Sequence, residues 1–242
     1  MIHSFLMIGQ SNMAGRGLLT DVPPINNPRL LMLRNGRFMK LSEPVNYDRP
    51  FAGVGPAPIF AKRLLATLPP EDAVGLIPCA DGGTALCEWQ EGSVLFDHAI
   101  AQAELAMRSS TLKGILWHQG ESDCGNGGWA CYGEELMKLF SALRSRLGPL
   151  PIVVGSLGDY LVDNPKNHLH SHYRAINEAL FALACAHKDI GFADAAGLTS
   201  LADLLHFDAV SARELGARYF EAYQSLMAGG TGLCLRSEGY RL

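Results

Sequence analysis

The fold is decided by residues 5–13, FLMIGQSNM, near the start of the chain. The apolar run Phe5–Ile8 stops abruptly at Gly9, which is typical of a buried strand that ends in a tight turn. In open α/β sheets, ligands bind in the crevice outside the carboxyl ends of the strands. Ser11 is the first hydroxyl after this strand, so it is a candidate nucleophile, although a serine in such a turn is often only a helix N-cap.

The rest of the chain alternates short apolar runs with helical patterns. This alternation predicts the α/β class, with a mostly parallel sheet that is covered by helices on both faces. Strands are expected at Phe5–Ile8, Ala73–Ile77, Gly114–Trp117, Ile152–Val154 and Ile190–Ala193. Helices are expected at Pro58–Leu68, Phe96–Arg108, Tyr132–Leu147, Tyr173–His187 and Ser211–Met227.

Three long segments interrupt this rhythm. Residues 18–57 are rich in Pro, Gly and Asn, and residues 79–95 and 119–131 are rich in Gly. Each follows an expected strand, so all three are predicted to meet at one edge of the sheet and to build a binding site. No repeat or linker divides the chain. We therefore expect residues 1–242 to form one domain, with residues 228–242 as a weakly ordered tail.

The composition limits the class of protein. The chain has 242 residues, 48% of them hydrophobic, which is enough for one well-buried core. The net charge is −4 and no basic stripe is visible, so a nucleic-acid partner is not expected. No apolar run approaches the length of a transmembrane helix, so no membrane association is expected.

The first residues and the cysteines bear on where the protein works. Met1 is followed almost at once by the first strand, without the charged segment and cleavage site of a secretory signal. A trimmed export signal is the alternative, which the early core strand disfavours. None of the six cysteines forms a C-x-x-C pair, so a zinc ribbon is not indicated and reduced thiols are expected. We expect a cytoplasmic protein.

A serine nucleophile needs a base and a group that orients the base. His206 follows Asp203 by three residues, so one turn can bring the carboxylate beside the imidazole. The alternative is that the two residues are a capping pair in a loop. His118, at the end of an expected strand, is a second candidate base. We interpret it instead as a supporting or substrate-contacting residue.

Two other patterns carry different chemistry. His168, His170 and His172 alternate, and on a strand they would present zinc ligands on one face. The segment leads into a helix, where alternate residues diverge, so a polar loop or a substrate rim is favoured and no metal is expected. Glu121 and Asp123 resemble the carboxylate pair of a glycosidase, but two residues on one loop are not expected to face each other across a sugar.

Acyl transfer also needs hydrogen-bond donors for the oxyanion. Residues 79–84, CADGGT, follow the second expected strand and offer a glycine-rich turn, although Gly82 and Gly83 alone indicate no more than a tight turn. Gln119, at the end of the third expected strand, has a side-chain amide that can donate. The chain contains no G-x-S-x-G, so the nucleophile elbow of α/β-hydrolases is not indicated.

Four blocks of sequence point together to one family. They are GQSNMAG at 9–15, GGT at 82–84 with Glu88 and Trp89, WHQGESD at 117–123, and DLLH at 203–206. In this order they resemble the sialate O-acetylesterase-like branch of the SGNH hydrolases. The same branch includes carbohydrate acetylesterases that act on acetylated xylan. The resemblance covers residues 9 to 206.

The resemblance implies a three-layer α/β/α sandwich, the flavodoxin-like SGNH hydrolase fold, with a five-stranded parallel sheet. It implies that Ser11 is the nucleophile, that His206 is the general base and then the acid, and that Asp203 orients the imidazole. It further implies an oxyanion hole formed by the N–H groups of Ser11 and Gly83 and by the Gln119 side chain.

A wider set of residues is expected to bind substrate or to support the site. These residues are Gln10, Asn12, Gly82, Thr84, Trp89, His118 and Glu121. Glu121 is expected to brace the active-site loops rather than to react. Trp89 and Trp129 lie in the loops beside the expected hole, and aromatic faces suit sugar rings. The alternative is that both tryptophans cap the edge of the core.

The sequence thus predicts a serine esterase without metal or cofactor that removes O-acetyl groups from a carbohydrate. The expected partner is a small-molecule or oligosaccharide acetyl ester, such as an acetylated xylo-oligosaccharide or sialic acid. The sequence also allows a homo-oligomer. A lipase or thioesterase would need an extended apolar channel, which the polar, glycine-rich loops disfavour. A carbohydrate-binding protein that lost the chemistry is the other alternative, although all three expected triad residues are present.

Overall fold

Eight strands form a single sheet in the computed structural model, which describes residues 1–125 and 127–236. The strand order is β3-β2-β4-β1-β5-β6-β7-β8, and every neighbouring pair is parallel except β2 and β3. The strands are β1 (Ile2–Gly9), β2 (Leu30–Arg34), β3 (Arg37–Lys40), β4 (Ala73–Pro78), β5 (Thr111–His118), β6 (Ile152–Gly155), β7 (Ile190–Ala193) and β8 (Leu233–Cys234).

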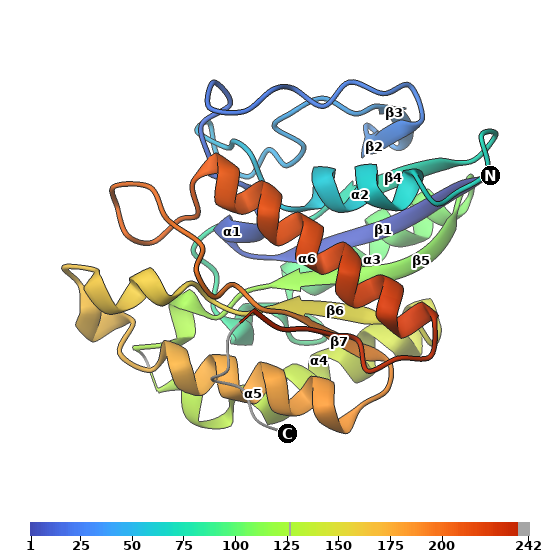
Figure 1. Cartoon of the computed structure of the whole chain (residues 1–242). Helices are drawn as coiled ribbons and strands as arrows, with labels where there is room; N and C mark the ends of the chain where they lie inside the picture. The colour runs from blue at the N-terminus through green and yellow to red at the C-terminus, as the bar shows by residue number, and fades with distance from the viewer. Residues whose placement is uncertain (126, 237–242) are drawn as a thin grey trace.

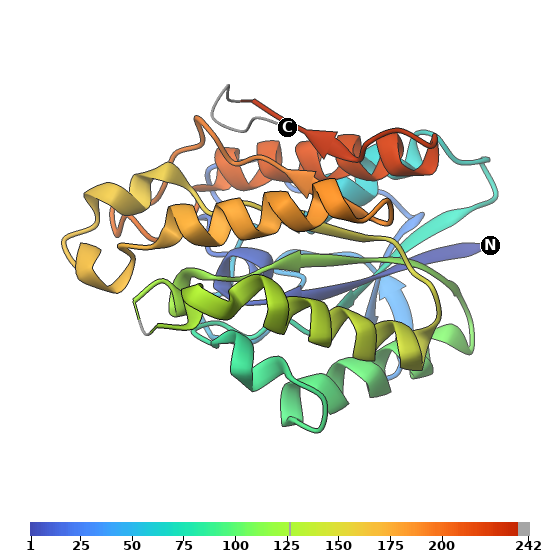
Figure 2. The same ribbon diagram turned by 90° about the horizontal axis from the view of Figure 1, so that it is seen from below.

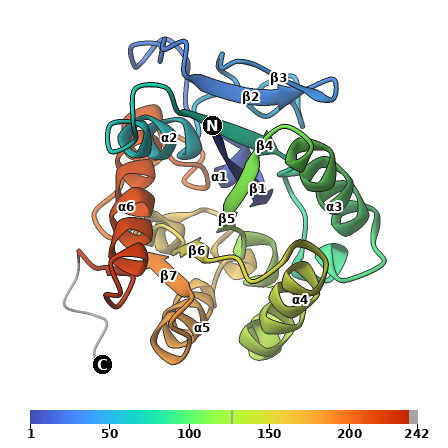
Figure 3. The same ribbon diagram turned by 90° about the vertical axis from the view of Figure 1, so that its right-hand side faces the viewer.

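Helices cover both faces of this sheet, as Figures 1, 2 and 3 show from three directions. The α-helices are α1 (Ser11–Ala14), α2 (Ala57–Leu65), α3 (Val94–Met107), α4 (Tyr132–Leu147), α5 (Tyr173–Ala186) and α6 (Ala209–Met227). Short 3₁₀ turns are η1 (Leu86–Trp89), η2 (Glu121–Asp123), η3 (Gly128–Cys131), η4 (Asp159–Asp163) and η5 (Asn167–Leu169). Within the described residues, no helix combines the length and apolar character that a membrane crossing requires.

A separate hydrophobic core lies on each face of the sheet. Phe96, Phe140 and Leu180 bring α3, α4 and α5 into one core. Phe60 and Leu215 bring α2 and α6 into the other. Because the central strands are buried on both faces, they consist of continuous apolar runs, which is why they could be predicted from sequence. The three-layer α/β/α arrangement is confirmed.

The five expected strands and five expected helices are present, but a five-stranded sheet was wrong. Segment 18–57 contains β2 and β3, which pair through residues such as Met32 and Met39. Residues 228–242 were expected to be a weakly ordered tail, yet Leu233 and Cys234 form β8 and pair with β7. The rest of that tail from residue 237 lies outside the described residues.

The two turns that carry the expected catalytic residues have clear local causes. Gly9 ends β1 with φ +120°, and a Cβ there would lie 2.1 Å from the carbonyl oxygen of His118, so only glycine fits beside β5. The Gln10 N–H then donates to the same carbonyl (2.9 Å) and starts α1. Asp208 caps α6 by accepting the Ser211 N–H (2.7 Å), which fixes where the preceding His206 loop ends.

Candidate active site

The candidate site lies at the carboxyl ends of β1, β4 and β5, where Figure 1 shows α1 facing the loop between β7 and α6. Ser11 begins α1, the Gly82–Gly83 turn follows β4, and Glu121 follows β5. His206 comes from the loop before α6. Residues almost two hundred positions apart therefore meet at one edge of the sheet, as expected for an open α/β fold.

Ser11, His206 and Asp203 form an unbroken chain of hydrogen bonds. His206 Nε2 lies 3.0 Å from Ser11 Oγ, and His206 Nδ1 lies 2.6 Å from Asp203 Oδ2. An imidazole that donates from Nδ1 to the carboxylate has Nε2 free to accept the serine proton. The structure thus brings together the three residues that the sequence suggested, in the order that a nucleophile, a base and an orienting carboxylate require.

The turn 203–206 holds the carboxylate in place. Asp203 Oδ1 accepts the backbone N–H groups of Leu205 and His206, each at 3.0 Å. Burial opposes ionisation of Asp203, but the hydrogen bonds from the His206 ring and from these two N–H groups outweigh it and lower the pKa of the carboxyl group. Asn164, which the sequence did not single out, donates from Nδ2 to the carbonyls of Asp203 (3.1 Å) and Leu204 (3.0 Å).

Asn12 clamps the backbone on both sides of His206. Its Nδ2 donates to the Leu205 carbonyl (3.1 Å), and its Oδ1 accepts the Phe207 N–H (3.1 Å). The same Nδ2 donates to Glu121 Oε1. Burial opposes ionisation of Glu121, but His118 and Asn12 outweigh it and lower the pKa of this carboxyl group. An ionised Glu121 thus fixes the Asn12 amide, and Asn12 fixes the imidazole loop.

A pocket of about 270 Å³ opens beside Ser11 and His206. Its walls are formed by Gln10, Ser11, Arg16, Arg49, Phe51, Gly82, Gly83, Glu121, Ser122, His170, Leu205 and His206. The N–H groups of Ser11 and Gly83 make no hydrogen bond within the described part of the chain. Two backbone donors are therefore free at this pocket, as an oxyanion hole requires.

Arg16 and Asp48, which the sequence analysis missed, hold the glycine turn. Their side chains form a buried ion pair, and Asp48 Oδ2 also accepts the Gly82 N–H (2.9 Å). A Cβ on Gly82 would lie 2.3 Å from Arg16 Nη2, so glycine is needed for this close approach. Burial opposes ionisation of Asp48, but Arg16, Gly82 and Asn46 outweigh it and lower the pKa of the carboxyl group.

Gln119 is not placed as the expected oxyanion donor. It is fully buried and absent from the pocket wall. Its Nε2 donates to the Thr84 carbonyl (2.9 Å), to Asp123 Oδ2 (2.6 Å) and to Gln10 Oε1 (3.2 Å), while its Oε1 accepts the Tyr132 hydroxyl (3.0 Å). Both amide protons already have buried acceptors, so the geometry makes Gln119 a brace between the loops.

Replacing Gln119 by alanine is expected to destabilise the fold as well as to slow turnover. The change leaves the buried Thr84 carbonyl without a donor, at a cost of about 1–3 kcal/mol, and it removes one of the two N–H donors to Asp123 Oδ2, the other being the Leu86 backbone. Thermal and urea unfolding of the variant measure this loss. An unchanged free energy of unfolding, with kcat lowered about 10²- to 10³-fold, would instead identify Gln119 as an oxyanion donor.

Trp89 and His118 do not contact the pocket either. Trp89 is 0% exposed, its Nε1 donates to Thr84 Oγ1 (3.0 Å), and its ring packs edge-on against Trp117, so the expected sugar platform is wrong for this residue. His118 is 0% exposed, with Nδ1 3.2 Å from the Tyr219 hydroxyl and Nε2 3.6 Å from Glu121 Oε1. Both residues support the site from inside the core.

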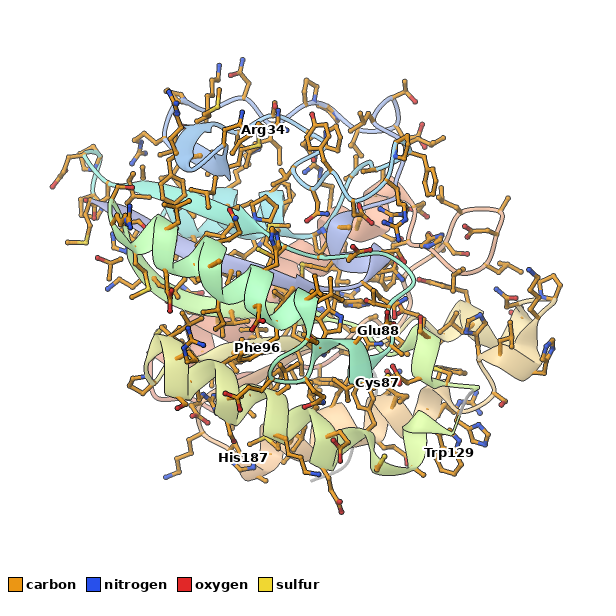
Figure 4. The ribbon with its side chains drawn as sticks, turned by 180° about the vertical axis from the view of Figure 1, so that it is seen from behind. Arg34, Cys87, Glu88, Phe96, Trp129 and His187 are labelled. Carbon is orange, nitrogen blue, oxygen red and sulfur yellow. The ribbon has the colours of Figure 1, made fainter. Side chains whose placement is uncertain are left out.

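The alternating histidines diverge, because they lie in the η5 turn and the loop before α5 and not on a strand. His168 is exposed, His170 lines the pocket with Nδ1 3.3 Å from the Glu121 carbonyl, and the His172 ring stacks on Trp129 at 4.1 Å. Figure 4 shows Trp129 at the lower right, far from Arg34. In the described residues, no three His, Cys, Asp or Glu side chains gather to hold a metal ion.

Comparisons with known proteins identify the family of this chain. The model of a family described as carbohydrate esterase, sialic acid-specific acetylesterase, matches residues 1–225. A relative from Arabidopsis thaliana, named as a probable carbohydrate esterase, is 32% identical to this chain over an alignment of 247 residues. The alignment covers 91% of this chain and 90% of the relative.

Solved structures extend the likeness. The crystal structure of a protein from Arabidopsis thaliana has a TM-score of 0.81 at 29% identity, covering 92% of this chain and 98% of that one. The crystal structure of NanS has a TM-score of 0.76 at 20% identity, covering 94% and 98%, and shows a likeness of fold alone. The resemblance drawn from the four sequence blocks is confirmed. The chain is a carboxylic ester hydrolase, and it belongs to the carbohydrate esterase family of sialic acid-specific acetylesterases.

Proposed function

We propose that Ser11, His206 and Asp203 act as a catalytic triad that removes O-acetyl groups from a carbohydrate through an acetyl-enzyme. The observation that carries this proposal is the hydrogen-bond chain from Asp203 through His206 to Ser11, with contacts of 2.6 and 3.0 Å. Membership of a carbohydrate esterase family supports the acetylated sugar as substrate.

In the first half of the reaction, Ser11 Oγ attacks the acetyl carbonyl while His206 Nε2 takes its proton. Asp203 stabilises the imidazolium that forms. The negative charge that develops on the carbonyl oxygen is stabilised by the free N–H groups of Ser11 and Gly83. His206 then gives its proton to the departing sugar oxygen, and the acetyl group stays on Ser11 as an ester.

In the second half, the same imidazole activates a water molecule that attacks the acetyl ester. His206 takes a proton from the water and returns it to Ser11 Oγ as the second tetrahedral intermediate breaks down. Acetate leaves and the free serine is restored. Each proton thus moves through one ring nitrogen. Asp203 orients this ring, and Asn12 holds the backbone of the residues before and after it.

The pocket beside Ser11 is expected to favour acetyl over longer acyl groups. Buried Glu121 and Arg16 form part of its walls, so a longer chain would have to displace them or lie in solvent. We expect kcat/KM for p-nitrophenyl esters to fall by about tenfold or more from acetate to octanoate. Steady-state hydrolysis of the acetate, butyrate and octanoate esters measures it. A rise with chain length would favour a lipase or thioesterase.

Acetate release from a panel of sugars tests the substrate class. The panel contains acetylated xylo-oligosaccharides, O-acetylated sialic acids and simple acetylated hexoses. We expect release from at least one class and no release by the Ser11→Ala variant. Hydrolysis of p-nitrophenyl acetate without release from any sugar would contradict the carbohydrate assignment and leave the triad intact.

A further inference from the structure

A second pocket of about 280 Å³ lies directly beside the catalytic pocket. At two places in the chain, consecutive residues line different pockets. Asp48 and Asp81 line the second pocket, and the residues that follow them, Arg49 and Gly82, line the catalytic pocket. Consecutive Cα atoms are only about 3.8 Å apart, so the two pockets adjoin each other along residues 48–49 and 81–82. The ion pair from Arg49 Nη2 to Asp81 Oδ1 (3.0 Å) joins residues of the two pockets.

Each pocket has one exposed aromatic ring from the same loop. Tyr47 in the second pocket is 62% exposed, and Phe51 in the catalytic pocket is 67% exposed. Arg34 covers one face of Tyr47, with its Cζ 4.1 Å from the centroid of the Tyr47 ring. Arg16 Cζ lies 5.3 Å from the centroid of the Phe51 ring. The exposure of both rings leaves an apolar face open to a ligand, as at binding sites.

Two buried polar atoms at the second pocket lack a partner within the described residues. Asn46 is 3% exposed, and its Nδ2 donates to the Ala80 carbonyl (2.8 Å), but its Oδ1 accepts nothing. Arg34 Nη2 likewise donates to nothing, and Figure 4 shows this arginine at the end of β2. Unpaired buried polar atoms are costly, so a ligand that pairs with them gains affinity.

The chemistry of this pocket fits a sugar ring better than an anion. A hydroxyl group both donates and accepts, so it can pair with Asn46 Oδ1 and with Arg34 Nη2. An anion only accepts and would leave Asn46 Oδ1 unpaired. The open face of Tyr47 suits the C–H face of a pyranose.

We propose that the second pocket binds a further sugar ring of the substrate, so that the enzyme acts on acetylated oligosaccharides rather than on single sugars. The inference rests on the proposed function. The ring that carries the acetyl ester lies in the catalytic pocket against Phe51, and its neighbour crosses the wall at Asp81 and stacks on Tyr47. Asn46 and Arg34 bind the hydroxyl groups of this neighbour.

The test uses the sugar class that releases acetate fastest in the panel. The acetylated monosaccharide is compared with the tetrasaccharide or, for a sialic acid, with the sialylated trisaccharide. We expect wild type to prefer the oligosaccharide in kcat/KM. Tyr47→Ala is expected to lower that preference by about two- to tenfold, mainly through KM, because one aromatic contact is lost. Tyr47→Phe keeps the ring and is expected to keep the preference.

Met107→Ala is the matched control, since Met107 is exposed at the end of α3 and lines neither pocket. Equal kcat/KM values for the two substrates in wild type would overturn the inference, and so would an equal loss on both in Tyr47→Ala. Neither result would contradict the proposed catalytic triad. If instead no sugar releases acetate while p-nitrophenyl acetate is hydrolysed, the proposed function itself fails.

Discussion

Replacing Ser11 by alanine is expected to lower kcat for p-nitrophenyl acetate by about 10⁴- to 10⁶-fold. The change removes the hydroxyl oxygen that lies 3.0 Å from His206 Nε2, so no acetyl-enzyme can form. The backbone donors and the pocket remain, and they account for the residual activity. Steady-state release of p-nitrophenol measures the effect.

Ser141→Ala is the matched control for this prediction. Ser141 lies on the exposed face of α4, and its hydroxyl donates only to the Met137 carbonyl (2.7 Å). Both variants are expected to unfold at the wild-type temperature within a few degrees. A Ser11→Ala variant that keeps more than about one hundredth of the wild-type kcat would rule out Ser11 as the nucleophile.

Replacing His206 by alanine is expected to lower kcat by a similar factor, about 10⁴- to 10⁶-fold, because no other described group is hydrogen-bonded to Ser11 Oγ. The His118 ring cannot substitute, since it is fully buried between Glu121 and Tyr219. Rapid mixing with p-nitrophenyl acetate measures acylation directly. We expect the wild-type burst of p-nitrophenol to disappear.

His187→Ala is the control for the His206 variant, since Figure 4 shows His187 at the end of α5 away from the active-site edge. It is expected to hydrolyse the ester at the wild-type rate. Persistence of a full burst in His206→Ala would show that another group takes the serine proton, and the triad would have to be reassigned.

Much of the fold follows from local patterns in the sequence. The central strands are buried on both faces, so runs such as Phe5–Ile8 and Ile152–Val154 are uninterrupted and easy to identify. The edge strands are different. Arg37–Lys40 is mostly exposed and Leu233–Cys234 has only two residues, so neither has a local signal. Their pairing depends on neighbours that the sequence does not place.

The candidate site divides in the same way. Ser11, Asp203 and His206 could be predicted because each stands in a recognisable block of sequence. The partner of a polar side chain could not, because it is set by how the loops pack. Gln119 donates to Asp123 in its own loop and to Thr84 in the loop after β4, and Trp89 lies in the core.

Three residues that help to position the site had no sequence signal. Arg16 and Asp48 are 32 residues apart, and Asn164 meets Asp203 across 39 residues. None of the three lies at a spacing that a helix or a strand would repeat. Their buried hydrogen bonds arise only when the loops gather at one edge of the sheet.

Labelling with a serine-directed fluorophosphonate tests the central claim most directly. The enzyme is treated until activity is lost, digested, and mapped by mass spectrometry, with His187→Ala and Ser11→Ala treated in parallel. The account predicts one phosphonyl group, on Ser11, in wild type and in His187→Ala, and none in Ser11→Ala. Loss of activity with the label on any other residue would contradict it.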